Sequence, residues 1–207
     1  MRAWVSVATV DLVPPSGHAA LAVFALAACA HGKVKLPGGP GDQAPSSLYV
    51  DRESGFSLER PTGHGWSSAS AVPSPDGLVI PLLVAHSTGV QIVVQVADAS
   101  ANAQEMARLL RVHVDAEAGI ATGRAAKIAN SAGQDAYGFG FRLEDHAAGR
   151  VAVVASGPRM ILVIASWPLG ANRDLVGQVD RLVLSVRATP GVPTVEDDDP
   201  VPSNQSL

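Results

Sequence analysis

In residues 160–165 the chain reads Met160-Ile161-Leu162-Val163-Ile164-Ala165, an apolar run with no polar side chain in it. Successive side chains of a β-strand point to opposite faces of the sheet, so this run carries apolar groups on both faces. Such a strand is stable only where other elements cover both faces. The run therefore predicts a strand buried inside a sheet that has a packed layer on each side.

Two strands are expected before this run, and the three form a meander. The first is Gln134–Leu143, the second is Arg150–Ala155 after the turn Glu144–Gly149, and the third extends over Met160–Trp167. In the first strand one face carries Tyr137, Phe139, Phe141 and Leu143, whereas the other carries Gly138, Gly140 and Arg142. Bare glycine positions allow a helix backbone to approach the strand closely. A ligand groove over the same glycines is the alternative.

The first half of the chain predicts three more strands. Gly55–Pro61 alternates apolar and polar residues and stops at a proline, which indicates a short strand near an edge. A loop is expected over Thr62–Asp76. Leu78–Ala85 and Val90–Ala97 then form a hairpin, in which Pro81 predicts an edge or bulged strand because proline has no N–H to donate.

Two amphipathic helices are expected, and each starts at an asparagine. Asn102 can cap the first helix because Glu105 stands three residues later, the spacing of a capping box, and Gly119 ends it. Its apolar stripe consists of Met106, Leu109, Leu110 and Val114. Asn172 caps the second helix, whose apolar face contains Leu175, Val176, Val179, Leu182, Val183 and Val186. Its water-facing residues are expected to include Arg173, Asp180 and Arg181.

These elements predict an α+β fold, an antiparallel β-sheet flanked by helices on both faces. The 207 residues suit a single domain. Because aromatic residues make up only 4% of the chain, Ala, Val and Leu must fill most of the core.

A family resemblance rests on two motifs. Gly55-Phe56-Ser57-Leu58-Glu59-Arg60-Pro61 is followed by Trp66, and the last helix runs into Ser185-Val186-Arg187. Together with the order of elements, these motifs resemble the PsbP-like superfamily over residues 48–188. That family includes a thylakoid-lumen protein of photosystem II, a nuclear-transport factor that binds a small GTPase, and many bacterial lipoproteins. The resemblance implies a sheet sandwiched by helices and used for binding or assembly, and it supplies no catalytic residue.

The only cysteine of the chain is its one candidate modification site. Leu26-Ala27-Ala28-Cys29 follows the apolar run Ala19–Ala28 and resembles a bacterial lipobox, in which a signal peptidase cuts before the cysteine. The thiol of Cys29 then carries diacylglycerol, and its new amine is acylated, for example with palmitate. On this interpretation residues 1–28 are a lipoprotein signal peptide. The alternative is a short buried helix with Cys29 in the core; the poor cationic content before the run, Arg2 alone, counts toward it.

Two segments flank the predicted domain, residues 48–188. Residues 29–47 are rich in Gly, Pro and Ser, without apolar periodicity, and are expected to be a flexible lipid-anchored tether. Residues 189–207 are expected to be a disordered, acidic, Pro-rich tail. Its run Glu196-Asp197-Asp198-Asp199 is interpreted as a solvated charge run rather than a calcium site.

The charge balance argues against nucleic acid as a partner. Between Ala30 and Ala188 the 14 basic residues equal the 14 acidic ones, so the net charge of the domain with its tether is 14 − 14 = 0. Nucleic-acid binding requires clustered Lys and Arg. No two histidines have the spacing of a metal pair, and no nucleotide motif occurs, so no metal and no cofactor are expected.

Three functions remain open from the sequence. The first is a non-catalytic binding or assembly domain in a cell-envelope lipoprotein, held on the membrane by Cys29 and contacting an unidentified envelope protein. The second is an envelope enzyme, such as a hydrolase, whose site assembles in space from residues such as His64 and Asp145. The third is a small-ligand carrier, which needs a sizeable apolar cavity.

Overall fold

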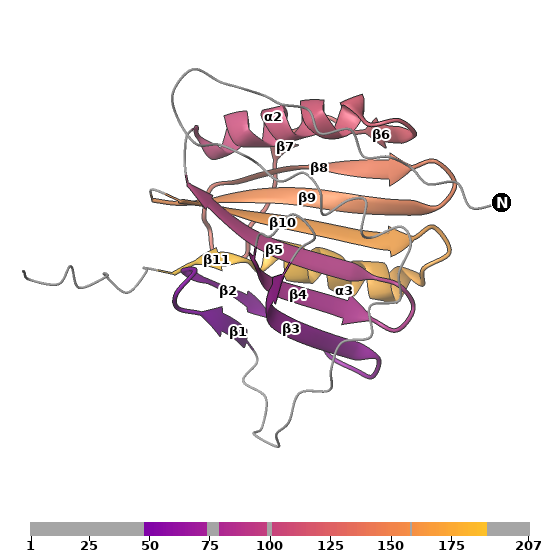
Figure 1. The fold of residues 1–207 in the computed structure, drawn as a ribbon, viewed down its shortest axis with the longest axis horizontal. Coiled ribbons are helices and arrows are strands. Elements are labelled where there is room, and N and C mark those ends of the chain that lie inside the picture. Colours follow the sequence, from indigo (N-terminus) through magenta and orange to yellow (C-terminus); the bar gives the residue numbers. More distant parts are fainter. Residues whose placement is uncertain (1–47, 74–78, 99–100, 158, 190–207) are drawn as a thin grey trace, which may run out of the picture.

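The computed structural model describes residues 48–73, 79–98, 101–157 and 159–189 (Figure 1). The predicted signal peptide, Cys29, the predicted tether and the predicted tail from residue 190 lie outside the described residues. The domain boundaries therefore stay a prediction. Within the described residues all paired strands are antiparallel and two helices are present, so the predicted α+β class is confirmed.

The larger sheet has eight strands in the order β3-β4-β5-β10-β9-β8-β6, with β7 pairing with β8. Its strands are β3 (Trp66–Pro73), β4 (Val79–His86), β5 (Gln91–Asp98), β6 (Ile120–Thr122), β7 (Ala126–Lys127), β8 (Ala136–Leu143), β9 (Ala147–Ser156) and β10 (Arg159–Pro168). The predicted β4–β5 hairpin and β8–β9–β10 meander are confirmed. β10 joins them, because it pairs with β5 on one side and β9 on the other.

A second, smaller sheet joins the two ends of the described chain. It consists of β1 (Leu48–Asp51), β2 (Phe56–Glu59) and β11 (Arg187–Ala188), in the order β1-β2-β11. The predicted edge strand, β2, is thus the middle strand of this sheet. Sequence periodicity could not reveal this, because β11 is only two residues long.

Both helices begin where the sequence predicts. α2 (Ala103–Ala116) starts after Asn102, whose side-chain oxygen accepts a hydrogen bond from the backbone N of Glu105 at 2.9 Å. α3 (Arg173–Leu184) starts after Asn172, whose side chain accepts from the backbone N of Asp174 at 2.8 Å. These bonds satisfy N–H groups that have no partner within the helix. α2 ends at Ala116, three residues before the predicted Gly119.

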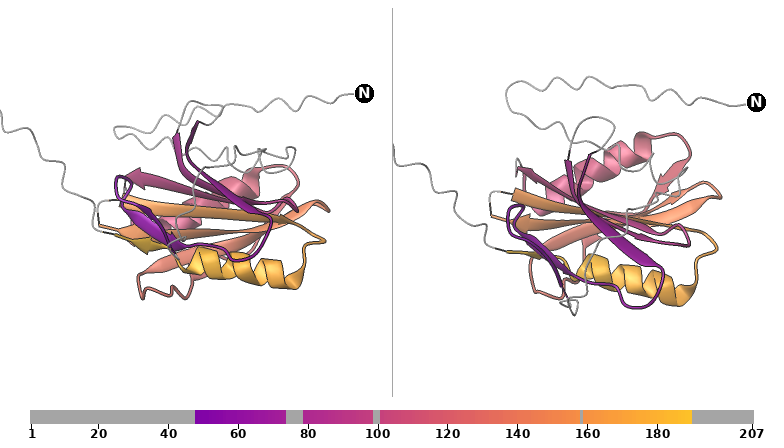
Figure 2. Two further views of the ribbon diagram at one scale, coloured as in Figure 1. Left: turned by 90° about the horizontal axis from the view of Figure 1, so that it is seen from below. Right: turned by 60° about the horizontal axis from the view of Figure 1, so that its bottom comes forward.

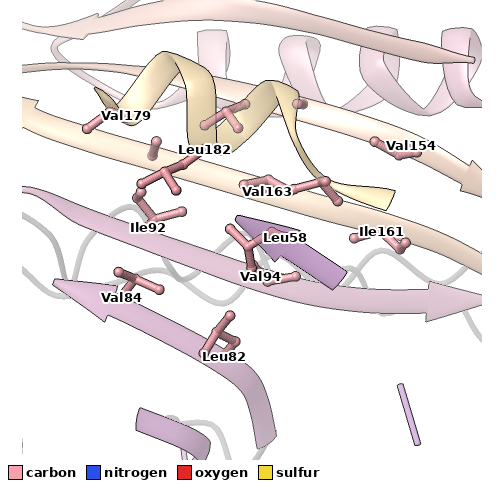
Figure 3. Packing of buried hydrophobic residues seen from close by; sticks show 14 of the residues in the cluster. Leu58, Leu82, Val84, Ile92, Val94, Val154, Ile161, Val163, Val179 and Leu182 are labelled. Carbon is pink, nitrogen blue, oxygen red and sulfur yellow. The ribbon is translucent and has the colours of Figure 1, made fainter. Parts of the chain in front are cut away.

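The strand β10 contributes alternate side chains to two apolar clusters. Met160, Leu162 and Ile164 lie in a cluster with residues of α2, whereas Ile161, Val163 and Ala165 lie in a cluster with residues of α3. Figure 3 shows part of the second cluster, with Leu182 of α3 close to Val163 of β10 and Ile92 of β5. In Figure 2 the two helices lie on opposite sides of the strands. Both faces of the run 160–165 are therefore buried, as its pattern predicts.

The predicted loop Thr62–Asp76 is wrong over residues 66–73, where β3 forms the outermost strand of the large sheet. β3 pairs with β4 from Trp66 opposite His86 to Pro73 opposite Val79. Its sequence WSSASAVP consists mainly of serine and alanine, which give no alternation of apolar and polar residues. Pairing with β4, together with the packing of Trp66 and Val72 against the apolar clusters, stabilises this segment as a strand.

Pro81 was expected on an edge or bulged strand, but β4 lies inside the sheet between β3 and β5. In an antiparallel pair, every second pair of facing residues exchanges backbone hydrogen bonds. The Ser87 N–H donates to the Gly65 carbonyl, so the bonded pairs follow at every second residue and include Ala71 opposite Pro81. Proline cannot donate there, and Ala71 has a φ of +52°, in the left-handed region. The β4–β5 pairing also begins only at Leu82. The strand is irregular at Pro81, although it is not an edge strand.

Three details of the predicted helix faces need correction. Leu109, expected in the apolar stripe of α2, is 51% exposed, because it lies on the outward side of the helix. Val176 is only partly buried. Asp180, expected to face water, is about one-third exposed and lies 3.1 Å from the Arg150 guanidinium in an ion pair between α3 and β9.

The glycine face of β8 is not covered by a helix. A Cβ at Gly138 would collide with the carbonyl oxygen of Val151 on β9 and would lie 3.2 Å from the side chain of Ile128. Gly140 is exposed, with the nearest contact at 3.7 Å. The backbone that requires glycine at 138 is therefore the neighbouring strand, and the predicted approach of a helix is wrong.

Replacing Leu182 with Asp is expected to destabilise the domain by several kcal/mol, because Leu182 is 3% exposed and the carboxylate would be buried without a partner. Thermal unfolding followed by circular dichroism measures the loss. Arg181→Asp, at an exposed neighbouring position of α3, is the matched control and should change the melting temperature much less. Equal melting of Leu182→Asp and wild type would contradict the packing of α3.

Candidate functional site

The two residues proposed for a hydrolase site do not come together. His64 precedes β3, whereas Asp145 lies between β8 and β9. Four strands, β4, β5, β10 and β9, separate β3 from β8 in the sheet. At about 4.8 Å per strand, the two positions lie roughly 24 Å apart. The pair therefore cannot share one substrate atom.

His86 is the residue that His64 does contact, and it holds two loops together. Its Nδ1 accepts a bond from the Thr88 backbone N at 3.3 Å, so Nε2 carries the proton and donates to the His64 carbonyl at 3.1 Å. The ring of Trp66 meets the imidazole edge-on, with centroids 4.9 Å apart. A Cβ at Gly65 would lie 2.7 Å from Nε2, which explains the glycine there. The contacts of His86 therefore hold the loop before β3 next to the β4–β5 turn.

The two motifs of the family resemblance meet in the small sheet. Ser185, which follows α3, is 1% exposed. Its hydroxyl accepts a bond from the Glu59 backbone N at 3.0 Å and donates to the Leu182 carbonyl at 2.8 Å. Phe56, in β2, is fully buried in the α3 cluster, and the Gly55 carbonyl accepts from Thr189. The two motifs are therefore hydrogen-bonded to each other, and we call this contact the joint between the two ends of the described chain.

Two polar side chains in the loop before β8 form hydrogen bonds with the backbone at β11, on the side away from β2. The Gln134 side chain accepts from the Ala188 N at 2.7 Å and donates to the Ala188 carbonyl at 3.1 Å, as a neighbouring strand would. Asn130 donates to the Val186 carbonyl at 2.7 Å. Sequence reasoning missed both residues, because nothing in their local pattern indicates a partner more than 50 positions away.

A shallow, open hollow of about 370 Å³ lies where β6 meets the end of β8. It is lined by Gly119, Ile120, Ala121, Arg142, Glu144 and Asp145. Arg142 lies 3.5 Å from Asp145 and donates to the Glu144 backbone carbonyl, so Arg142 and Asp145 already contact each other. A ligand carrier needs an enclosed, mostly apolar pocket, which this hollow does not provide.

The outer side of α2 combines apolar and charged groups. Leu109 and Val112 are exposed by 51% and 61% and stand three residues apart, on the same face. At the end of the helix, the Thr122 hydroxyl donates to Asp115 at 2.6 Å, and Arg111 lies 3.4 Å from the same carboxylate. The Thr122 hydrogen bond is the main cause that lowers the pKa of Asp115, with Arg111 adding to it.

The described residues contain neither a metal-binding cluster nor a membrane-spanning helix. No three His, Cys, Asp or Glu side chains in residues 48–73, 79–98, 101–157 and 159–189 are grouped so that they could hold a metal ion. In the same part of the chain, no helix has the length and apolar character needed to cross a bilayer.

Comparison with known proteins supports the fold. No family model and no curated protein matches the chain. Its structure is similar to that of cyanobacterial PsbP (CyanoP) from Synechocystis sp. PCC 6803, with a TM-score of 0.51 and 15% identity, over 73% of this chain and 98% of that one. LpqN, involved in cell envelope biogenesis of Mycobacterium tuberculosis, matches with a TM-score of 0.47 and 13% identity, over 65% of this chain and 83% of that one. The described residues thus form a PsbP-like fold.

Ser185→Ala is expected to cost about 1–3 kcal/mol, because the buried Glu59 N–H loses its acceptor. Urea unfolding of the variant and wild type measures the difference. Ser131→Ala, at an exposed serine in the loop before β8, is the control and should leave the midpoint unchanged. If both variants unfold at the same urea concentration, the hydroxyl does not hold the joint.

Asp115→Asn is expected to reduce stability at neutral pH and to have less effect in acid. A carboxylate with a lowered folded-state pKa stabilises the protein above its unfolded value, near 3.9, and this contribution disappears as the pH falls through the folded value. Melting temperatures between about pH 7 and pH 2 measure the gap between variant and wild type. A gap that widens toward low pH would have the wrong sign. Glu117→Gln controls for loss of one charge at this end of α2.

Proposed function

We propose that the protein is a bacterial cell-envelope lipoprotein whose PsbP-like domain binds or helps to assemble an envelope partner and performs no catalysis. Lipid on Cys29 holds it at the membrane. The observation that carries the proposal is the combination of Leu26-Ala27-Ala28-Cys29 after an apolar run with a PsbP-like domain starting near Leu48. The first element is a lipoprotein processing signal, and the second is a compact unit suited to presentation on a tether.

The place where the chain enters and leaves the domain supports this arrangement. β1 begins at Leu48 opposite Glu59, and β11 ends at Ala188 opposite Phe56, so both extensions start from the small sheet. α2 packs on β8, β9 and β6, toward the β6 end of the large sheet, whereas the extensions leave from the separate small sheet (Figure 1). Attachment through the small sheet leaves α2 and the large sheet free to contact a partner.

The length of the preceding segment also suits a membrane-bound domain. Residues 29–47 span at most about 65 Å when fully extended. The domain therefore stays within one such length of the bilayer that holds Cys29. A partner within the same distance of the membrane is accessible, whereas a partner farther away is not.

The arrangement of the polar groups supports binding rather than hydrolysis. His64 and Asp145 are separated by four strands, and both ring nitrogens of His86 are engaged in holding loops. A hydrolase requires a nucleophile, a base and an orienting group within hydrogen-bond reach of one another. The exposed surfaces of α2 and of the sheet edge are better suited to a macromolecular partner than to a small substrate.

Cys29→Ala is expected to move the protein from the membrane fraction to the soluble fraction, because no lipid can be attached. Fractionation of cells and metabolic labelling with palmitate measure this change. Ser46→Ala, in the same segment, is the matched control and should remain labelled and membrane-bound. Wild-type protein that takes up no label and keeps its N-terminus uncleaved before Cys29 would contradict lipid anchoring.

The binding part of the proposal requires a separate measurement. Crosslinking in intact cells followed by mass spectrometry should recover a reproducible envelope protein with wild type. The double variant Leu109→Asp, Val112→Asp tests the α2 surface; it replaces two exposed side chains and should preserve the fold. An unchanged crosslinking pattern would exclude α2 as the contact surface.

A further inference from the structure

The outer edge of β3 is an open strand edge. β3 is the first strand of the large sheet, and no strand among the described residues pairs with its other side. Between Trp66 and Ser70 its sequence is WSSAS, with no charged residue and no proline. Unpaired backbone N–H and C=O groups on such an edge form a template for another strand.

The phase of the β3–β4 ladder shows which groups are available. The Ser87 N–H donates to the Gly65 carbonyl, so positions 65, 67 and 69 bond toward β4. In β4 the His86 N–H donates to Val90 instead, which confirms that the ladder alternates in this phase. The backbone groups of Trp66, Ser68 and Ser70 therefore point away from the sheet.

The other sheet edges within the described residues are protected. At the opposite edge of the large sheet, β6 and β7 are three and two residues long, and Lys127 of β7 forms an ion pair with Asp135. β1 has four residues, ends in Asp51 and is followed by Arg52. Short edge strands and charged side chains prevent pairing with other chains. β11, the remaining edge, has two residues and is hydrogen-bonded by the Gln134 side chain. Among the edge strands of the described residues, only β3 combines a length of eight residues with a neutral edge.

We propose that the β3 strands of two copies of this protein pair antiparallel about a twofold axis at Ser68. In this register Ser68 faces Ser68 of the second copy, and Trp66 faces the second copy's Ser70. A twofold axis places each strand against its own sequence, so any charged residue near the axis would lie close to a like charge. β3 has none, and its small serine and alanine side chains leave room for a neighbour.

The ends of β3 limit the paired segment to residues 66–70. Gly65 has a φ of +91°, and Ala71 has a φ of +52°, so the extended edge stops at both positions. A five-residue ladder buries little area and forms a reversible dimer. This inference goes beyond the proposed function and does not depend on lipid attachment, because the interface uses only residues of the domain.

Oligomeric state is the test, measured by light scattering on the full-length chain in mild detergent, at concentrations up to on the order of 1 mM. Wild type should approach twice the monomer mass. Ser68→Lys and Ser68→Glu should each weaken the dimer roughly 10-fold or more, because like charges then face each other. A mixture of the two variants should restore dimers, since opposite charges then meet; this also shows that both variants fold.

Two further variants complete the test. Ser131→Lys adds the same charge far from β3 and should dimerise like wild type. Ser70→Pro removes only an outward N–H and should give a folded monomer. Wild type that is monomeric throughout, or Ser68→Lys that dimerises as tightly as wild type, would overturn the proposal. So would pairing of β3 with a different protein while the chain itself remains monomeric.

Discussion

β10 needs a covering layer on each face, and the rest of the fold follows from that requirement. Its six apolar residues from 160 to 165 cannot face water on either side without losing on the order of 1.5–3 kcal/mol for each large side chain left exposed. α2 precedes the meander and meets one face, whereas α3 follows it and meets the other. β5 and β9 complete the burial by pairing along both edges. Elements from both halves of the chain are therefore required before this strand is stable.

The small sheet holds the first and last strands of the described chain together. β2 would be a short, weak strand by itself, but β11 and the Ser185 hydroxyl supply hydrogen bonds from the opposite end of the chain. Gln134 then satisfies the outer side of Ala188. Residues of the PsbP-like pattern lie at this joint, where their hydrogen bonds hold the two ends of the described chain together. This is a physical reason why one fold can serve unrelated functions.

Several polar side chains of the domain connect elements in the same way. His86 holds the loop before β3 against the β4–β5 turn, and Asp115 ties α2 to β6. Arg150 and Asp180 join β9 to α3. Among the described residues, the β3 edge also presents unpaired backbone groups, and α2 presents the exposed side chains of Leu109 and Val112.

Periodicity determined the elements that have strong local patterns: both helices with their asparagine caps, the hairpin, the meander and the two buried faces of β10. The amino-acid sequence also contains the lipobox-like segment at Cys29, which lies outside the described residues. Tertiary structure alone decided that β3 and β11 are strands. The serines and alanines of β3 show no alternation of apolar and polar residues, and β11 is too short to show one. Tertiary structure also decided that His64 and Asp145 lie apart, because strand order is a long-range property. Local patterns record which side chains must be buried, whereas strand neighbours depend on which segments meet after the chain closes.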